Sequence, residues 1–352
     1  MRKILTIKIL LIIYSIILKA NEPINNEKNF FLMKGNIGNI PITIYLYIDN
    51  NDKKISGKYY YNNIKQFINI SGKLNDDNSF YIDEYINNNY NTGRFEGNIS
   101  NFIFSGMWFS PSRENRFEFN FAISQDNTIN KMRIISSTLT LKSDERANFT
   151  ATKEALIIDN NKNIKEINKI SMNINQLQSI EYSDISKKLK DSILESYNIW
   201  QEAQSQSRNF EVENNIKVSY IDNNIISFNI YDYAYTGGLH GIYTSIPYIY
   251  SIKTGDRIGR KISDLIENPY DLDLISLMRT KLLRSFSDND FFDFYSIELS
   301  DIYDITPTGI KFIWPVYKIA GYSTGIIEIE FSFYELKPFI KKNSDFEYLF
   351  NN

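Results

Sequence analysis

The sequence contains no cysteine and only one histidine among its 352 residues, and both facts limit its chemistry. Without cysteine there is no disulfide, no thiolate nucleophile, no cysteine-ligated zinc and no lipid-modified N-terminal cysteine. A single histidine excludes histidine-rich metal sites and argues against most metal-assisted hydrolysis. We therefore expect no metal and no cofactor, and a core held by apolar burial alone, which a chain of this length permits.

The charge is also small, and this argues against one class of partner. The formal net charge is −3 and no long basic run is present, so we expect no binding of nucleic acid. Aromatic residues, by contrast, make up 15% of the chain, with 25 tyrosines and 24 phenylalanines. Aromatic side chains favour β-strands, which indicates a mainly β protein.

Residues 1–20 have the pattern of a signal peptide. Arg2 and Lys3 are followed by the apolar run Ile9–Leu18, and Ala20 is the expected cleavage position. The run is shorter than the roughly 20 apolar residues that a membrane-spanning helix needs. We expect an exported protein, periplasmic or extracellular. If the segment is not cleaved, it would act as an N-terminal anchor and as the contact with the membrane.

Residues 29–125 are predicted to form an antiparallel β-meander that closes into a barrel-like domain. The alternation of Ile42, Ile44 and Leu46 with polar or aromatic residues has period two. Glycines inside the strands either allow the sheet to curve or leave room for a ligand cup lined by Tyr59, Tyr60, Tyr61, Trp108 and Phe109. Glu84, Glu96 and Glu118 are expected on a solvated face. The predicted strands are Phe30–Lys34, Pro41–Ile48, Ile55–Tyr61, Gln66–Lys73, Phe80–Ile86, Gly93–Ile99, Phe102–Phe109 and Phe117–Ile123.

Residues 133–350 are predicted to form an α+β domain, an antiparallel sheet with two helices on one face. The apolar stripe over Asp184–Gln206 predicts the first helix, and Pro269–Phe286, capped by Asn268, predicts the second. The run Ile167–Ile174 is predicted to be a strand. Further strands are expected at Ile134–Lys142, Lys217–Ile221, Ile225–Tyr235, Ile242–Ile252, Gly309–Ile319 and Thr324–Phe333.

The hexapeptide from Thr236 to Gly241 contains the single histidine, His240, among three glycines. In such a turn His240 either hydrogen-bonds a backbone carbonyl as a brace, contacts a partner, or acts in catalysis. The catalytic alternative is a hydrolase in which His240 works with Asp232 and with a nearby serine (Ser227, Ser245 or Ser251). None of these serines lies in a nucleophile-elbow pattern, so we expect a non-catalytic role.

Two motifs indicate a family. The motif Gly237-Gly238-Leu239-His240-Gly241 is followed, after the second predicted helix, by Gly321-Tyr322-Ser323-Thr324-Gly325. Over roughly residues 160–340 the pattern resembles the RsiV-like domain of bacterial envelope proteins, which also accompanies the catalytic domain of PdaC-type peptidoglycan deacetylases. The resemblance implies an extracytoplasmic, non-catalytic binding domain behind a barrel-like module. We expect neither a sigma-factor regulator, which carries a sigma-binding segment before a membrane span, nor a deacetylase, whose metal site needs several histidines and aspartates.

The partner implied by this resemblance is an envelope protein, such as a muramidase, or a wall glycan. Aromatic side chains that look exposed would serve as anchors. An architectural spacer remains a further alternative, and it would carry no recessed aromatic pocket. The predicted binding residues are Tyr235, Gly237, Gly238, His240, Tyr243, Trp314, Tyr317 and Tyr322.

Overall fold

The computed structural model describes residues 23–86, 90–142, 147–159, 164–202 and 209–351. The predicted signal peptide, residues 1–20, lies outside these ranges. Within them, no helix combines the length and the apolar character needed to cross a membrane.

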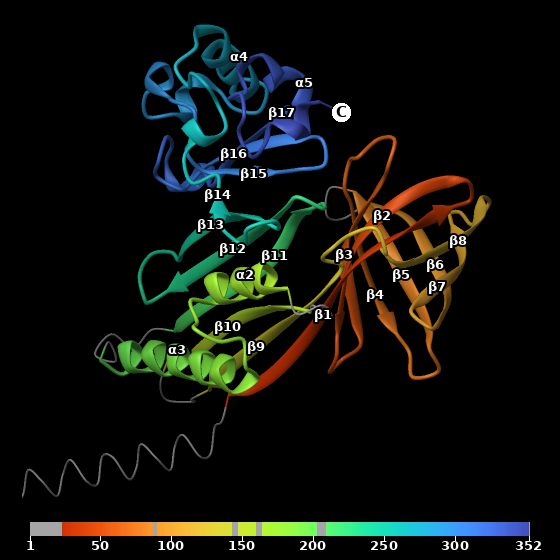
Figure 1. Cartoon of the computed structure of the whole chain (residues 1–352). Coiled ribbons are helices and arrows are strands. Elements are labelled where there is room, and N and C mark those ends of the chain that lie inside the picture. Colours follow the sequence, from red (N-terminus) through yellow and green to blue (C-terminus); the bar gives the residue numbers. More distant parts are fainter. Residues whose placement is uncertain (1–22, 87–89, 143–146, 160–163, 203–208, 352) are drawn as a thin grey trace, which may run out of the picture.

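The N-terminal part of the chain is a closed antiparallel barrel (Figure 1). Each strand pairs with the next, and Met33–Ile37 of the first strand closes the barrel on Phe119–Ile123 of the last. The strands approach closely at this seam, because a Cβ at Gly35 would lie 1.9 Å from the carbonyl oxygen of Asn120. All strands predicted in this region are confirmed: β1 (Ile24–Ile37), β2 (Ile40–Asp49), β3 (Lys54–Tyr61), β4 (Ile68–Leu74), β5 (Ser79–Ile86), β6 (Tyr90–Ser100), β7 (Ile103–Phe109) and β8 (Arg116–Ile123).

The interior of the barrel is a packed apolar core. Ile42, Ile44 and Leu46 point inward as their alternation predicts, and they meet the rings of Phe95 and Phe119. These two rings lie 5.2 Å apart in an edge-on arrangement, as is typical of packed aromatic side chains. Of the two interpretations of the strand glycines, the structure favours curvature around a filled core.

Strand β1 also connects the barrel to the remaining strands of one continuous 14-stranded sheet. The first half of β1, Ile24–Phe31, pairs with β9 and not with β8. Beyond β9 the strands form an open sheet next to the barrel (Figure 1). In this sheet β10 and β11 are parallel and the other neighbours are antiparallel. Strand β10 was not predicted. The sheet comprises β9 (Lys131–Leu141), β10 (Phe149–Ile158), β11 (Phe210–Ile221), β12 (Ile225–Tyr235), β13 (Ile242–Ser251) and β14 (Arg257–Ile258).

Two helices cover β9 and β10. Helix α3 (Tyr182–Glu202) confirms the first predicted helix as far as Glu202, and the predicted end at Gln206 lies outside the described residues. The prediction of a strand at Ile167–Ile174 is wrong, because this segment lies in helix α2 (Lys165–Asn175). Its buried residues, Ile167, Ile170, Ser171 and Ile174, are spaced by three and four, the period of a helix and not of a strand.

The C-terminal part is a small antiparallel sheet formed by β15 (Tyr303–Ile305), β16 (Gly309–Trp314) and β17 (Ile327–Ser332). Helices α4 (Leu272–Leu282) and α5 (Phe333–Leu336) contact it, and we call residues 262–350 the small-sheet lobe. The expected cap at Asn268 is wrong, since the Asp271 side chain accepts from the backbone N–H groups of Asp273 and Leu274. The mainly β fold with an α+β C-terminal part is confirmed.

The outer face of the barrel is joined to β11. The hydroxyl oxygen of Tyr47 accepts a hydrogen bond from the backbone N–H of Val218 at 2.8 Å, and that of Tyr45 accepts from Ile221 at 3.1 Å. Both rings lie on the barrel face opposite to Ile44 and Leu46, and Tyr45 is fully buried. The barrel is therefore attached by side chains from its outer face to the edge of a strand in the next sheet.

Candidate functional site

The glycine-rich hexapeptide forms the tip of the hairpin between β12 and β13. Gly237 has a φ of 87°, a left-handed conformation that favours glycine. A Cβ at Gly241 would lie 2.4 Å from the ring of Tyr233, so a larger residue there would have to displace that ring. The Tyr235 hydroxyl donates to the carbonyl of Gly238 at 3.2 Å, which closes the tip.

His240 lies at this tip and joins it to the small-sheet lobe. Its ring stacks on that of Tyr322, with centroids 3.7 Å apart and an interplanar angle of 19°. Nδ1 lies 3.2 Å from the carbonyl oxygen of Gly241, and Nε2 lies 3.2 Å from the hydroxyl of Tyr317. If Nδ1 carries the proton, it donates to the carbonyl and Nε2 accepts from Tyr317. The contact with a backbone carbonyl is the one expected of a structural brace.

The residues around His240 form an aromatic cluster. The Tyr322 hydroxyl also donates to the Gly241 carbonyl, at 2.6 Å, and the Tyr243 ring lies 6.0 Å from that of Tyr322. Tyr317 is half exposed at 52%, and Leu239, which precedes His240 in the hairpin tip, is wholly exposed. We call His240, Tyr243, Tyr317 and Tyr322 the tip cluster. It brings together four of the predicted binding residues.

Trp314 does not belong to this surface. The expectation that it is exposed is wrong, because its side chain is 1% accessible in the apolar core of the small-sheet lobe. Its indole Nε1–H donates to the carbonyl of Glu298 at 3.2 Å. Trp314 therefore supports the lobe from inside and offers no surface anchor.

The hydrolase alternative requires a carboxylate and a serine beside His240, and the structure engages the candidates elsewhere. The Asp232 carboxylate accepts from the side chain of Asn214 at 2.8 Å, and the Ser245 hydroxyl donates to Asn229 at 2.9 Å. Ser227 is fully buried and donates to Asp304. Across the described part of the chain, the polar contacts of His240 are a backbone carbonyl and a tyrosine, and no metal-binding group of His, Asp and Glu is found.

One end of the barrel holds a polar group that the sequence did not indicate. The expectation that Glu84 is solvated is wrong, because it is 3% exposed inside the barrel. The Tyr59 hydroxyl donates to its carboxylate at 2.5 Å. Gly93 leaves room for this carboxylate, since a Cβ there would lie 2.6 Å from both Glu84 Oε1 and the Trp108 ring. Of the residues proposed to line a cup, Tyr60 packs outside the barrel instead, against Phe67.

Glu84 should make the stability of the barrel depend on pH. Burial raises the pKa of this carboxyl group above its ordinary value of 4.5, so folding favours its protonated form. Its contribution is therefore most favourable below pH 4.5, and it falls by about 1.4 kcal/mol per pH unit as the pH rises from 4.5 to the pKa of the folded state. We expect Glu84→Gln to gain stability relative to the wild type over this pH range, measured by urea unfolding at a series of pH values. A difference that does not change with pH would contradict a buried, titrating Glu84.

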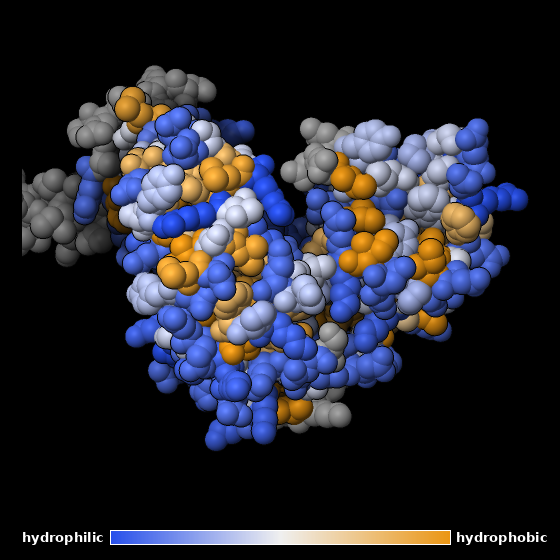
Figure 2. Space-filling view, turned by 90° about the horizontal axis from the view of Figure 1, so that it is seen from above, coloured by the Kyte–Doolittle hydropathy of each residue, from blue (hydrophilic) through white to orange (hydrophobic). Residues whose placement is uncertain are grey.

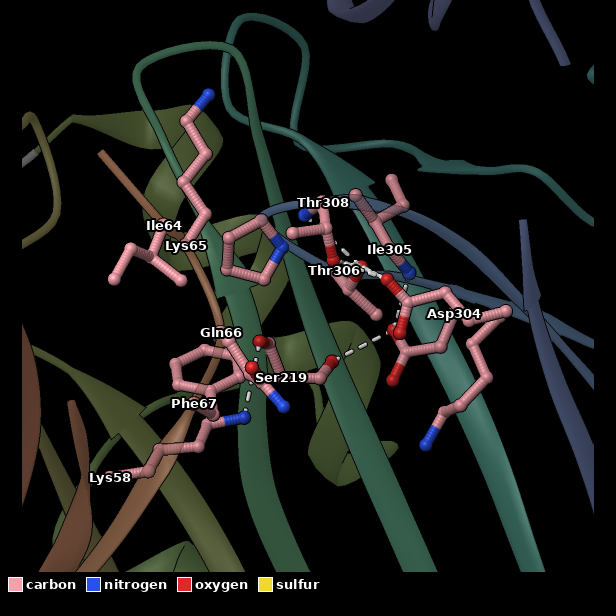
Figure 3. A pocket seen from close by; sticks show the side chains of 13 residues that line it. Lys58, Ile64, Lys65, Gln66, Phe67, Ser219, Asp304, Ile305, Thr306 and Thr308 are labelled. Carbon is pink, nitrogen blue, oxygen red and sulfur yellow. Dashed lines mark hydrogen bonds between the residues drawn. The ribbon is translucent and has the colours of Figure 1, made fainter. Parts of the chain in front are cut away.

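A cavity between the barrel and the small-sheet lobe is the second candidate site. Its volume is about 550 Å³, and Figure 3 shows the side chains that line it. The walls come from three segments far apart in the sequence: Lys58 and Phe67 of the barrel, Ser219 of β11, and Asp304 and Glu330 of the small sheet. In the view of Figure 2 the two lobes are separated by a notch. No local motif marks this cavity, which explains why the sequence did not predict it.

Two family models match parts of the chain. Residues 143–243 match the model of the deacetylase PdaC, and residues 261–334 match that of a protein family of unknown function, DUF3298. The tip cluster spans both matched stretches, with His240 and Tyr243 in the first and Tyr317 and Tyr322 in the second. These matches carry the PdaC and DUF3298 names and not the RsiV-like name. No curated protein matches the chain.

Two crystal structures of DUF3298 family proteins match the chain. One, from Bacteroides fragilis, has a TM-score of 0.50 and 15% identity, and the match covers 62% of this chain and 96% of that one. The other, from Pseudomonas aeruginosa, has a TM-score of 0.44 and 12% identity, and covers 62% of this chain and 98% of that one. At 15% identity the first match shows a shared fold and no more.

Proposed function

We propose that this chain is an exported, non-catalytic binding protein of the bacterial cell envelope that recognises a protein partner through the tip cluster. The families that match the chain are found in envelope-associated proteins, which supports the location. The observation that carries the proposal is the combination of a braced turn and exposed apolar side chains at its tip.

The bracing matters because rigid anchors bind more tightly than mobile ones. The Gly241 carbonyl is contacted by both His240 and Tyr322, so the tip is held in one conformation before a partner arrives. Leu239 is wholly exposed and Ile242 is 58% exposed on either side of His240 and Gly241, and the half-exposed Tyr317 contacts His240. Aliphatic and aromatic side chains together suit the apolar centre of a protein–protein interface better than the hydroxyl-rich surface of a sugar.

The proposal is tested by binding of purified muramidases and purified wall fragments to the immobilised protein. We expect at least one muramidase to be retained, and Leu239→Asp to weaken its affinity about tenfold or more, because a charge would enter the apolar centre of the interface. Tyr334→Ala is the matched control, since Tyr334 is 88% exposed on α5 outside the tip cluster. Retention of wall fragments alone would assign the site to a glycan, and equal affinities of the two variants would overturn the role of the tip.

A further inference from the structure

The cavity between the lobes has Lys58 on its barrel wall, and on its small-sheet wall two carboxylates together with Lys311, whose ammonium pairs with Glu328 at 2.9 Å. Lys58 of the barrel provides an ammonium and Asp304 of the small sheet a carboxylate (Figure 3), and Glu330 provides a second carboxylate to the lining. None of the ion pairs found in the described ranges joins Lys58 to either carboxylate. Lys58 and the two carboxylates thus line one cavity without an ion pair between them.

The Lys58 ammonium is held in place and only partly satisfied. It lies 3.9 Å from the centre of the Phe67 ring and donates to the Ser219 carbonyl at 3.4 Å. Burial lowers the pKa of this amine to about 8, against the opposing effect of Asp304. An ammonium has three N–H donors, so the Ser219 carbonyl leaves capacity for a further acceptor.

Both carboxylates are anchored through a single oxygen. Oδ1 of Asp304 accepts from the hydroxyls of Ser219 and Ser227, at 2.8 and 2.7 Å, and from the N–H of Ile305. Oε1 of Glu330 accepts from the hydroxyls of Thr306 and Thr308. In each case the hydrogen bonds that the structure describes go to one oxygen. The second oxygen of each carboxylate therefore has capacity to accept a hydrogen bond from a ligand.

We propose that this cavity binds a small zwitterion, a free amino acid or a short peptide, whose carboxylate contacts Lys58 and whose ammonium contacts Asp304 and Glu330. The two charges of such a ligand match the two walls, and each completes the hydrogen bonding of a group already held in place. The volume of about 550 Å³ lies in the usual range of small-molecule sites. The Phe67 ring provides an apolar surface for the rest of the ligand.

The test is isothermal titration calorimetry of the whole protein with L-alanine, with D-alanine and with the dipeptide Ala-Ala. Propionate and propylamine, which carry one charge each, are the control ligands. We expect at least one of the zwitterions to bind about tenfold or more tightly than either control ligand. Absence of binding at millimolar concentrations, or equal binding of propionate, would overturn the proposal.

Substitutions of the lining residues test whether the ligand binds in this cavity. Lys58→Met and Glu330→Gln should each weaken binding about tenfold or more, whereas Lys54→Met, an exposed lysine of the same strand as Lys58, should not. Glu330 is exposed, so Glu330→Gln keeps the test decisive if Lys58→Met does not fold. Unchanged affinity in Glu330→Gln would place the ligand elsewhere. The muramidase assay does not use this cavity, so either proposal can fail without the other.

Discussion

Trp314→Ala is expected to lower the free energy of unfolding by about 3–5 kcal/mol, the usual cost of removing a large buried aromatic side chain. The indole is 1% exposed and packs in the core of the small-sheet lobe. The substitution leaves a cavity there, and the carbonyl of Glu298 loses its indole donor. Urea unfolding measures the change.

Tyr317→Ala is the matched control for this prediction. Tyr317 lies three residues further along and is 52% exposed, with its hydroxyl against His240. An exposed side chain of this kind usually contributes no more than about 0.5 kcal/mol. If both variants lost the same small amount of stability, the buried placement of Trp314 would be wrong.

The barrel could be predicted from the sequence because each strand carries its own evidence. Alternation of period two, as in Ile42, Ile44 and Leu46, identifies the inward face, and polar turns separate the strands. The burial of the outer face could not be predicted. Tyr45 is buried because β11, which is more than 160 residues away in the chain, lies against it.

The misassigned segments had ambiguous local patterns. Ile167–Ile174 is apolar enough for a strand, yet Ile167, Ile170 and Ile174 follow the helical spacing that α2 adopts. Trp314 precedes Pro315, which has no N–H to donate to a β-ladder, and this suggested an edge or a bulge. Its burial depends on the packing of α4 and the small sheet around it, which no local pattern reports.

The candidate sites differ in how far they could be predicted. The glycines around His240 indicated a braced turn, and the predicted contact with a carbonyl is present at Gly241. The pairing of His240 with Tyr322 joins two motifs that are 82 residues apart in the sequence and that only the family resemblance linked. Lys58 and Asp304 lie in strands without any motif, and the fold alone brings them to one cavity.

A second large effect is expected where β10 and β11 separate. The two strands pair only from Phe149 to Thr152, and beyond this point the edge of β11 lies against other elements. The Glu154 carboxylate lies in this gap with its side chain 3% exposed. One oxygen accepts from the Ile216 N–H at 2.7 Å, and the other pairs with Lys28 of β1 at 3.1 Å. Glu154 thus connects the barrel strand β1, β10 and β11.

Glu154→Ala is expected to lower the free energy of unfolding by roughly 3 kcal/mol, because it leaves a buried N–H without an acceptor and removes the partner of Lys28. Urea unfolding measures the loss. Hydrogen exchange of the Ile216 amide should become faster, since this N–H then has no partner at the strand edge.

Two control variants distinguish the effect of losing the hydrogen bond from Ile216 from the effect of losing the ion pair with Lys28. Glu154→Gln keeps a carbonyl oxygen that can accept from Ile216, so the protection of this amide should remain while the ion pair is lost. Tyr47→Phe removes the acceptor of Val218 and should increase exchange there without affecting Ile216. If the glutamine and alanine variants exposed the Ile216 amide equally, the carboxylate would not be its acceptor, and β11 would be held to the barrel by the tyrosine hydroxyls and apolar packing alone.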